Sequence, residues 1–250
     1  MKKPFSQLTG LGCALLDLFA PPLCPLCAEF PPSGHAGLCT DCHLAIKAVR
    51  EPFCPVCALP FEGTGPSHAC SLCAKRPPPF VATRALGHFD GSLRQAIRQF
   101  KYHGNLALRN ALLELFTTMC LSEWGEKGAF DAVTPVPCHR EDLVKRGFDL
   151  PALLSRKVAK SWGVPWRPDA LIKTRPGVGM AGLTLKERTR AVAGLYRKGQ
   201  RVSGRVLLVD DVITSTATVR AAARGLLRAG AVEVFVAALA RTPTAPQRVL

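Results

Sequence analysis

Eight of the eleven cysteines form four pairs with one common spacing, Cys-x-x-Cys. A gap of two residues lets both thiolates of a pair turn towards one metal ion, and two pairs complete a tetrahedral four-sulfur shell. Loops of 11, 11 and 12 residues separate the pairs, close to zinc-ribbon spacing. The sequence therefore predicts two structural zinc ions, with a disulfide-rich domain or an iron–sulfur centre as alternatives. The predicted ligands are Cys24, Cys27, Cys39, Cys42, Cys54, Cys57, Cys70 and Cys73.

Loop length permits two ways of sharing the four pairs between two ions. Sequential pairing gives the first two pairs to one ion and the last two to the other. Interleaved pairing joins the first pair to the third and the second to the fourth. Sequential closure needs the shorter loops, so we favour it. In either arrangement the closed sulfur shell leaves no coordination position open for catalysis.

A second group of polar residues stands where an apolar strand leads into a helix. Val206–Val209 is an unbroken apolar run, typical of a strand buried on both faces, and it ends in Asp210 and Asp211. A helix follows over 219–229 and a further strand over 232–239, which together form a βαβ unit in a parallel sheet. The loop between the acidic pair and this helix contains Thr214, Ser215, Thr216, Ala217 and Thr218.

This strand-end loop has the chemistry of a sugar-phosphate site. Free N–H groups and the dipole at a helix N-terminus favour a phosphate, and the hydroxyls add donors. Asp210 and Asp211 would repel that phosphate, so we expect them to face vicinal sugar hydroxyls, with Mg²⁺ close by. The loop therefore predicts a ribose 5-phosphate site. The alternative is an acidic pair that ends a strand and precedes a helix without binding a ligand.

The remaining sequence supplies the elements that must position these residues. Residues 1–76 contain a predicted N-terminal amphipathic helix, roughly 7–19, and the double zinc ribbon; the prolines at 77–79 indicate an extended linker over 77–80. Residues 81–250 form the second domain. Its predicted strands cover 83–89 and 131–136 besides the βαβ unit, and its predicted helices start at 92 and cover 105–119, 150–162 and 186–193. This alternation predicts an α/β fold.

Charge differs sharply between the two parts. Residues 1–80 carry 6 basic and 5 acidic residues, and residues 81–250 carry 27 and 13, a net charge of +14. A body this basic attracts phosphate-bearing partners, either small molecules or nucleic acid. No apolar run is long enough to cross a bilayer, so we expect no membrane insertion. Zinc-binding thiols must stay reduced, which favours the cytoplasm.

The motifs as a set resemble a known family. Val206–Thr218, VLLVDDVITSTAT, resembles the 13-residue phosphoribosyl-pyrophosphate (PRPP) signature of type I phosphoribosyltransferases. The chain from about 15 to 242 is similar to the ComF family, competence-associated proteins that join a double zinc ribbon to such a domain. Further matching segments are FKYHG at 100–104, VTPVP at 133–137, KRGF at 145–148, ER at 187–188 and ART at 240–242. The resemblance implies a phosphoribosyltransferase-like parallel sheet with helices on both faces.

The resemblance also implies roles for residues. Asp210 and Asp211 would hold the ribose hydroxyls, and Thr214 to Thr218 would hold the 5′-phosphate of PRPP bound with Mg²⁺. Arg140, Lys145 and Arg146 would lie on the pyrophosphate side. The chain departs from the family pattern at Thr216, where glycine is usual, and at Asp149, where asparagine is usual. A β-branched residue at 216 resists the positive φ that glycine permits.

Three functions are compatible with these features. The first is a DNA-uptake accessory that binds single-stranded DNA, PRPP or both, with a helicase-like ATPase as the partner that the resemblance implies. The second is an active transferase that moves ribose 5-phosphate from PRPP to an unknown base. The third is a sensor of PRPP or a nucleotide without turnover.

Overall fold

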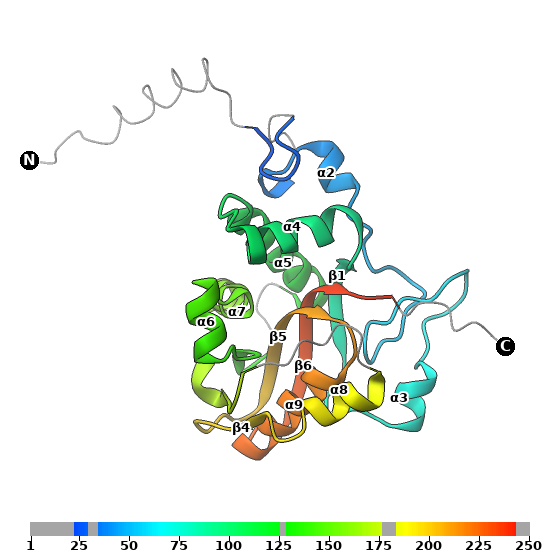
Figure 1. Cartoon of the computed structure of the whole chain (residues 1–250). Helices are drawn as coiled ribbons and strands as arrows, with labels where there is room; N and C mark the ends of the chain where they lie inside the picture. Colours follow the sequence, from blue (N-terminus) through cyan, green and yellow to red (C-terminus); the bar gives the residue numbers. More distant parts are fainter. Residues whose placement is uncertain (1–22, 30–34, 126–128, 177–183, 244–250) are drawn as a thin grey trace, which may run out of the picture.

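The structure is a computed structural model, and it describes residues 23–29, 35–125, 129–176 and 184–243. The predicted helix over 7–19 lies outside these residues. A four-stranded parallel sheet runs through the centre of the molecule, in the order β1-β6-β5-β2 (Figure 1). Its strands are β1 (Thr83–His88), β2 (Ala132–Pro135), β5 (Arg205–Ile213) and β6 (Glu233–Arg241). A separate antiparallel pair joins β3 (Leu171–Lys173) to β4 (Tyr196–Lys198).

Helices cover both faces of this sheet, which confirms the predicted α/β fold. Alternate residues of β5 point to opposite faces: Leu207 and Val209 pack in one core, and Val206 and Leu208 in another. The first core contains side chains of α4 (Gly91–His103), α5 (Leu108–Trp124) and α7 (Leu150–Trp162). The second contains α9 (Ala217–Ala229) with the β3–β4 pair. Two further helices of this part are the short α6 (Arg140–Arg146) and α8 (Leu185–Ala191).

Strand β5 is longer than its apolar run predicts. The prediction that the strand ends at the acidic pair is wrong, because β5 continues through Asp210 and Asp211 to Ile213. The ladder with β6 accounts for the extension: Asp210 pairs with Ala238, and Ile213 pairs with Arg241. The acidic pair therefore sits within the last part of the strand, where the ladder fixes its backbone.

The zinc-ribbon part shares a core with the α/β part. It contains η1 (His35–Gly37), α2 (Thr40–Leu44) and α3 (Ser71–Lys75). Leu26 and Leu38 are buried in the same cluster as the side chains of α5. Asn105, between α4 and α5, donates its side-chain amide to the Pro25 carbonyl at 2.8 Å. In Figure 1 the segment with α2 accordingly lies beside α4, whereas α3 lies away from that helix at the lower right.

The predicted linker is not a free spacer. Phe80, its last residue, is buried in the core beneath α9, and Val81 N–H donates to the Val234 carbonyl at 2.8 Å. Burying the phenylalanine side chain is more favourable in free energy than leaving it exposed in a free linker. The chain therefore passes from the zinc ribbon into the sheet along a packed segment.

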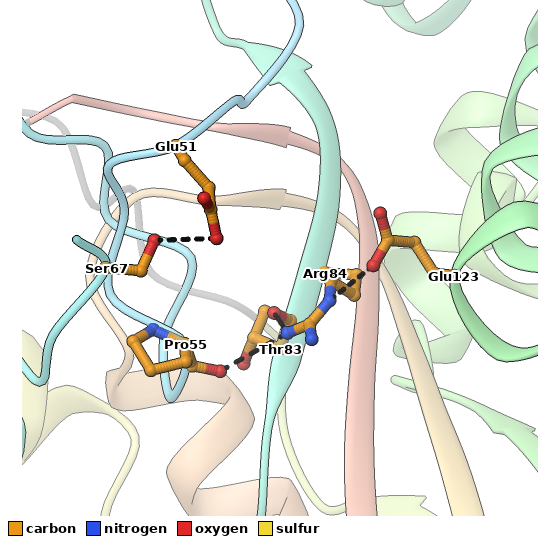
Figure 2. Close-up of polar contacts among 6 residues, drawn as sticks. All are labelled: Glu51, Pro55, Ser67, Thr83, Arg84 and Glu123. Carbon is orange, nitrogen blue, oxygen red and sulfur yellow. Dashed lines mark hydrogen bonds and ion pairs between the residues drawn. The ribbon is translucent and has the colours of Figure 1, made fainter. Parts of the chain in front are cut away.

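The second half of the zinc-ribbon part lies along strand β1. Arg84 Nη1 donates to the Pro55 carbonyl at 3.4 Å, and Arg84 Nε pairs with Glu123 Oε2 at 2.6 Å (Figure 2). The Thr83 N–H also donates to the Pro55 carbonyl. The Cys54–Cys57 turn is thus attached to the sheet through its own backbone. Among the described residues, no helix combines the length and apolar character that a bilayer crossing requires.

Candidate metal centres and ligand cavity

The eight paired cysteines form two clusters of four. In each cluster the four Sγ atoms all lie within 4.8 Å of one another. One cluster contains Cys24, Cys27, Cys39 and Cys42, and the other contains Cys54, Cys57, Cys70 and Cys73. The pairs therefore combine sequentially, as favoured from loop length, and the eight thiols are not joined in disulfides.

The spacing of the sulfurs fits a tetrahedral zinc ion. Cys27 Sγ lies 3.8 Å from Cys39 Sγ, and Cys57 Sγ lies 3.7 Å from Cys70 Sγ. Four sulfurs at about 2.3 Å from a central zinc ion lie about 3.8 Å from one another. Both donor sets are consistent with structural zinc, and both are complete without a water or substrate ligand.

Backbone amides support the sulfurs in both clusters. The N–H of Cys39 donates to Cys24 Sγ at 3.4 Å, and the N–H of Cys70 donates to Cys54 Sγ at 3.3 Å. A zinc ion with four thiolates carries a net charge of −2, so such donors offset part of the negative charge. The two clusters repeat this contact at equivalent positions, because the third cysteine of each set follows a loop of similar length.

The second cluster lies deeper than the first and has a cation beside it. All four of its cysteines are buried, whereas Cys27 and Cys42 of the first cluster are half-buried. Burial raises the pKa of the Cys57 thiol to about 11, and the Arg241 guanidinium acts in the opposite direction. Arg241, at the end of β6, is itself only 4% exposed. Its positive charge favours the thiolate form that a zinc ion needs.

A cavity of about 510 Å³ opens at the carboxyl edge of the parallel sheet. Its walls are formed by the end of β5, the segment after β2, helix α4, the start of α7 and the β3–β4 pair. This is the edge at which open parallel sheets bind their ligands. The polar residues on its walls are Arg98, Lys101, Cys138, Asp149, Lys173, Tyr196, Asp210, Asp211, Thr214 and Thr218.

The predicted acidic pair lines this cavity. Asp210 is 8% exposed, and its Oδ1 accepts the N–H of Asp211 at 2.9 Å. Burial, assisted by the charge of Asp211, raises the pKa of Asp210 to about 7. Asp211 forms an ion pair with Lys101 of α4, and both side chains are largely buried. Near neutral pH the Asp210 carboxyl is therefore partly protonated, and its neighbour Asp211 is paired with Lys101.

Only part of the predicted phosphate loop lines the cavity. Thr214 and Thr218 lie on its wall, whereas Ser215, Thr216 and Ala217 do not. Thr216 is buried, and its Oγ1 accepts a hydrogen bond from Arg220 Nε at 2.8 Å. Its φ is −75°, an ordinary value for a β-branched residue. The departure from glycine at this position therefore introduces no backbone strain.

Of the three cations expected on the pyrophosphate side, only Arg140 has a described side chain. Arg140 is exposed at the start of α6 and does not line the cavity. Lys145 and Arg146 end α6, and their side chains lie outside the described part of the chain. The described cavity wall carries Lys101 and Lys173. The Nζ of Lys173 lies 3.2 Å from Asp142 Oδ2 of α6.

Comparison with known proteins assigns the chain to a family. Residues 15–75 match the double zinc ribbon domain. DNA utilization protein YhgH from Escherichia coli (strain K12) is 30% identical over 228 residues, which are 90% of this chain and 99% of that protein. Competence protein F from Haemophilus influenzae (strain ATCC 51907 / DSM 11121 / KW20 / Rd) is 25% identical over 82% of this chain and 90% of its own length. Competence protein ComFC from Bacillus subtilis (strain 168) is 22% identical over 77% of this chain and 79% of its own length. The chain belongs to the ComF family.

Sequence reasoning gave no role to Lys101, Lys173 or Tyr196 of this ComF protein's cavity, and it noted Asp149 as a departure from the family pattern. Lys101 lies in the FKYHG segment, which was matched to the family without a role for its lysine. Asp149 caps α7, where its Oδ1 accepts the Ala152 N–H at 3.3 Å, and its Oδ2 accepts the Cys138 N–H. Burial raises the pKa of Asp149. Lys173 and Tyr196 come from the β3–β4 pair, and no sequence motif pointed to a function for that pair.

Proposed function

We propose that this ComF protein is an accessory factor in the uptake or use of single-stranded DNA and that its cavity binds a phosphorylated ribose. The relatives named for DNA utilization and competence support the cellular role. The net charge of +14 over residues 81–250 supports contact with a polyanion. The predicted ligand of the cavity is PRPP with Mg²⁺, or a nucleotide with the same ribose 5-phosphate core.

The observation that carries the ligand proposal is that acidic and hydroxyl side chains from the end of β5 and the start of α9 line the same cavity. Asp210 and Asp211 provide acceptors for vicinal hydroxyls, and Thr214 and Thr218 provide hydroxyl donors beside the start of α9. A helix of 13 residues adds free N–H groups and a favourable dipole for the phosphate. A cavity of about 510 Å³ is large enough for a nucleotide-sized molecule.

The charges on the cavity wall suit a ligand that carries both phosphate and hydroxyl groups. Lys101 pairs with Asp211 in the free protein. If ribose hydroxyls donated hydrogen bonds to Asp211, Lys101 would be able to contact a phosphate of the ligand. Lys173 stands on the same wall as a second cation. Mg²⁺ bound to the diphosphate of PRPP would offset charge beside the acidic pair.

Two matched threonine variants test the ligand proposal by calorimetric titration with Mg²⁺–PRPP, ribose 5-phosphate and a nucleoside monophosphate. Thr218→Val removes a hydroxyl on the cavity wall and keeps the side-chain shape, so we expect the dissociation constant to rise about tenfold. Thr216→Val removes a buried hydroxyl that bonds Arg220 and is the control, for which we expect little change in affinity. Equal losses in both variants, or no wild-type binding of any phosphorylated ribose, would contradict the site.

The same titration distinguishes binding from turnover. A phosphoribosyltransferase releases pyrophosphate from PRPP when the acceptor base is present, and the cavity residues would position the ribose for that displacement. We propose binding as the function of this cavity. Pyrophosphate release with a purine or pyrimidine base, lost in Asp210→Asn, would instead establish the transferase.

The double zinc ribbon is proposed as the docking module for a protein partner, for which the family resemblance suggests a helicase-like ATPase. Its exposed apolar residues include Leu44, which is 76% exposed on α2. Co-purification of wild type and Leu44→Ser with such an ATPase tests this role. Equal recovery with both proteins would contradict docking through α2.

A further inference from the structure

One buried arginine connects the second cysteine cluster to the strand-end loop of the cavity. Arg241 is the last residue of β6 and is 4% exposed. Its Nε donates to the Cys57 carbonyl at 3.0 Å, in the turn that contains two of the four sulfurs. Its Nη1 donates to the Thr214 carbonyl at 2.8 Å and to the Ile213 carbonyl at 3.1 Å. The same guanidinium therefore holds a metal-binding turn on one side and the proposed ligand loop on the other.

These contacts account for most of the hydrogen-bonding capacity of the side chain. A guanidinium has five N–H groups in a rigid plane, and Nη1 also donates to the Thr242 carbonyl at 2.8 Å. All four acceptors are neutral backbone carbonyls, and no carboxylate of the described residues pairs with Arg241. A buried cation needs compensating charge, and the loaded four-thiolate zinc centre beside it carries −2.

The backbone of Arg241 is fixed by pairing with β1 and β5, whereas Thr214 lies just beyond the paired part of β5. The Ile213 carbonyl also accepts the Thr242 N–H at 3.0 Å, so β5 and β6 remain paired up to the loop. The Thr214 carbonyl accepts its hydrogen bond from Arg241, and the Thr214 side chain lies on the cavity wall. One side chain, that of Arg241, therefore joins the Thr214 carbonyl to the Cys57 turn.

We infer that Arg241 is a positioning residue through which the second zinc centre and the sugar-phosphate cavity are energetically coupled. When the Cys54–Cys57 turn is folded around its ion, Arg241 is held in the geometry that fixes the Thr214 loop for ligand binding. Loss of the ion frees the Cys57 carbonyl and loosens that loop. Because coupling between two sites is reciprocal, ligand in the cavity also strengthens the binding of the second zinc ion, which we expect to observe as slower release of that ion. The inference rests on the proposed ribose-phosphate function of the cavity.

A second arginine provides a matched control. Arg84 of β1 also donates to a carbonyl of the same metal-binding turn, that of Pro55, and it contacts the Thr83 carbonyl, Glu123 and the Phe53 ring (Figure 2). It makes none of the Ile213 and Thr214 contacts that Arg241 makes. Arg84→Met and Arg241→Met therefore both remove an arginine from the turn, and only the second disconnects it from the cavity.

The test measures zinc release and ligand affinity on the full chain. A chelator that reports zinc by absorbance follows the release of both ions with and without saturating Mg²⁺–PRPP. In the wild type we expect the ligand to slow the release of one equivalent by about fivefold or more and to leave the other unchanged. The unaffected equivalent is an internal control for zinc binding by PRPP in solution. This measurement needs no variant, so it holds even where a substitution prevents folding.

The two variants then assign the coupling to Arg241. We expect Arg241→Met to abolish the protection of zinc and to weaken Mg²⁺–PRPP about tenfold, with two zinc ions still bound. Arg84→Met should keep both the protection and an affinity within about twofold of the wild type, although both proteins melt earlier. Arg241→Lys keeps the charge without the planar fork and should resemble Arg241→Met more than the wild type.

The outcomes separate this inference from the proposed function. Ligand binding without protection of either zinc ion overturns the coupling and leaves the cavity assignment intact. Protection that survives in Arg241→Met, or that is lost equally in Arg84→Met, also overturns the role of Arg241. Absence of any ligand binding by the wild-type protein overturns the proposed function, and the coupling with it.

Discussion

The Asp210 side chain is buried, so its ionisation is unfavourable in the folded protein. Burial and the charge of Asp211 raise its pKa to about 7, while Lys101 lowers it only in part. The folded protein therefore binds a proton at Asp210 more tightly than the unfolded chain, whose aspartates titrate near 4. The sign follows from linkage: this group favours folding below about pH 4, and the benefit is lost as pH rises to about 7.

Asp210→Asn should remove this pH dependence. At pH 8 we expect the free energy of unfolding of the variant to exceed that of the wild type by about 2 kcal/mol, with little difference at pH 4. The amide oxygen can still accept the Asp211 N–H, so the local geometry is kept. Urea unfolding at both pH values measures the effect. Asp169→Asn is the control, because Asp169 is half-exposed. A wild-type stability that is flat between pH 5 and 8 would contradict the prediction.

At the residue scale, the sequence predicted the sulfurs better than the cavity. A Cys-x-x-Cys turn is local, so four such turns identify their own chemistry wherever the fold places them. Lys101, Asp149, Lys173 and Tyr196 come from four separate elements, which the fold brings together at one edge of the sheet. No spacing in the sequence reports that convergence. Arg140 was predicted at the cavity from motif resemblance, and it lies exposed on α6 instead.

Two helices of equal length offer a test at the scale of elements. Gly163 ends α7 with φ 68° and open space around its Cα, and Gly230 ends α9 with φ 111°. A Cβ at Gly230 would lie 2.5 Å from the Val202 carbonyl oxygen. We expect Gly163→Ala to cost about 1 kcal/mol and Gly230→Ala about 3 kcal/mol of unfolding free energy. Chemical denaturation measures both, and equal losses would show that the chain near Val202 yields easily.

Element boundaries were predicted well where the signal was local. The helix over 150–162 was predicted with the bounds that α7 has, because Asp149 caps its start and Gly163 its end. The end of β5 was predicted too early, since its extension depends on pairing with β6, which follows 20 residues later. The proline run at 77–79 was interpreted as a spacer, and the burial of Phe80 could be known only from the packed core.

Zinc content tests the architecture of the whole molecule. We expect two equivalents per chain by elemental analysis, because both four-cysteine clusters have complete donor sets. Chelation should lower the melting temperature of the entire protein, since Cys24 and Cys39 share a core with α5. Circular dichroism during chelation follows this loss. A stable zinc content below two, or a melting temperature unaffected by chelation, would contradict the shared core.

Salt dependence tests the basic body as a DNA-binding surface. Helix α9 contains Arg220, Arg224 and Arg228 at intervals of four residues and has no acidic residue. We expect the affinity for single-stranded DNA to fall steeply when the salt concentration is raised from about 50 to about 200 mM. Arg224→Gln should reduce the logarithmic slope by about 0.7, the release expected for one phosphate contact. Arg50→Gln makes the same charge change in the zinc-ribbon part and should leave the slope unaltered; fluorescence anisotropy measures both.

The shared core also limits how the chain can be divided. Leu26 and Leu38 cover apolar side chains of α5, and Phe80 continues the packing on the opposite face of the sheet. A fragment that started after the proline run would expose the apolar surface of α5 to water. A fragment that ended at the run would lack the α5 side chains against which Leu26 and Leu38 pack. Fragments that begin or end at that run should therefore aggregate. We expect neither fragment to fold as an independent domain.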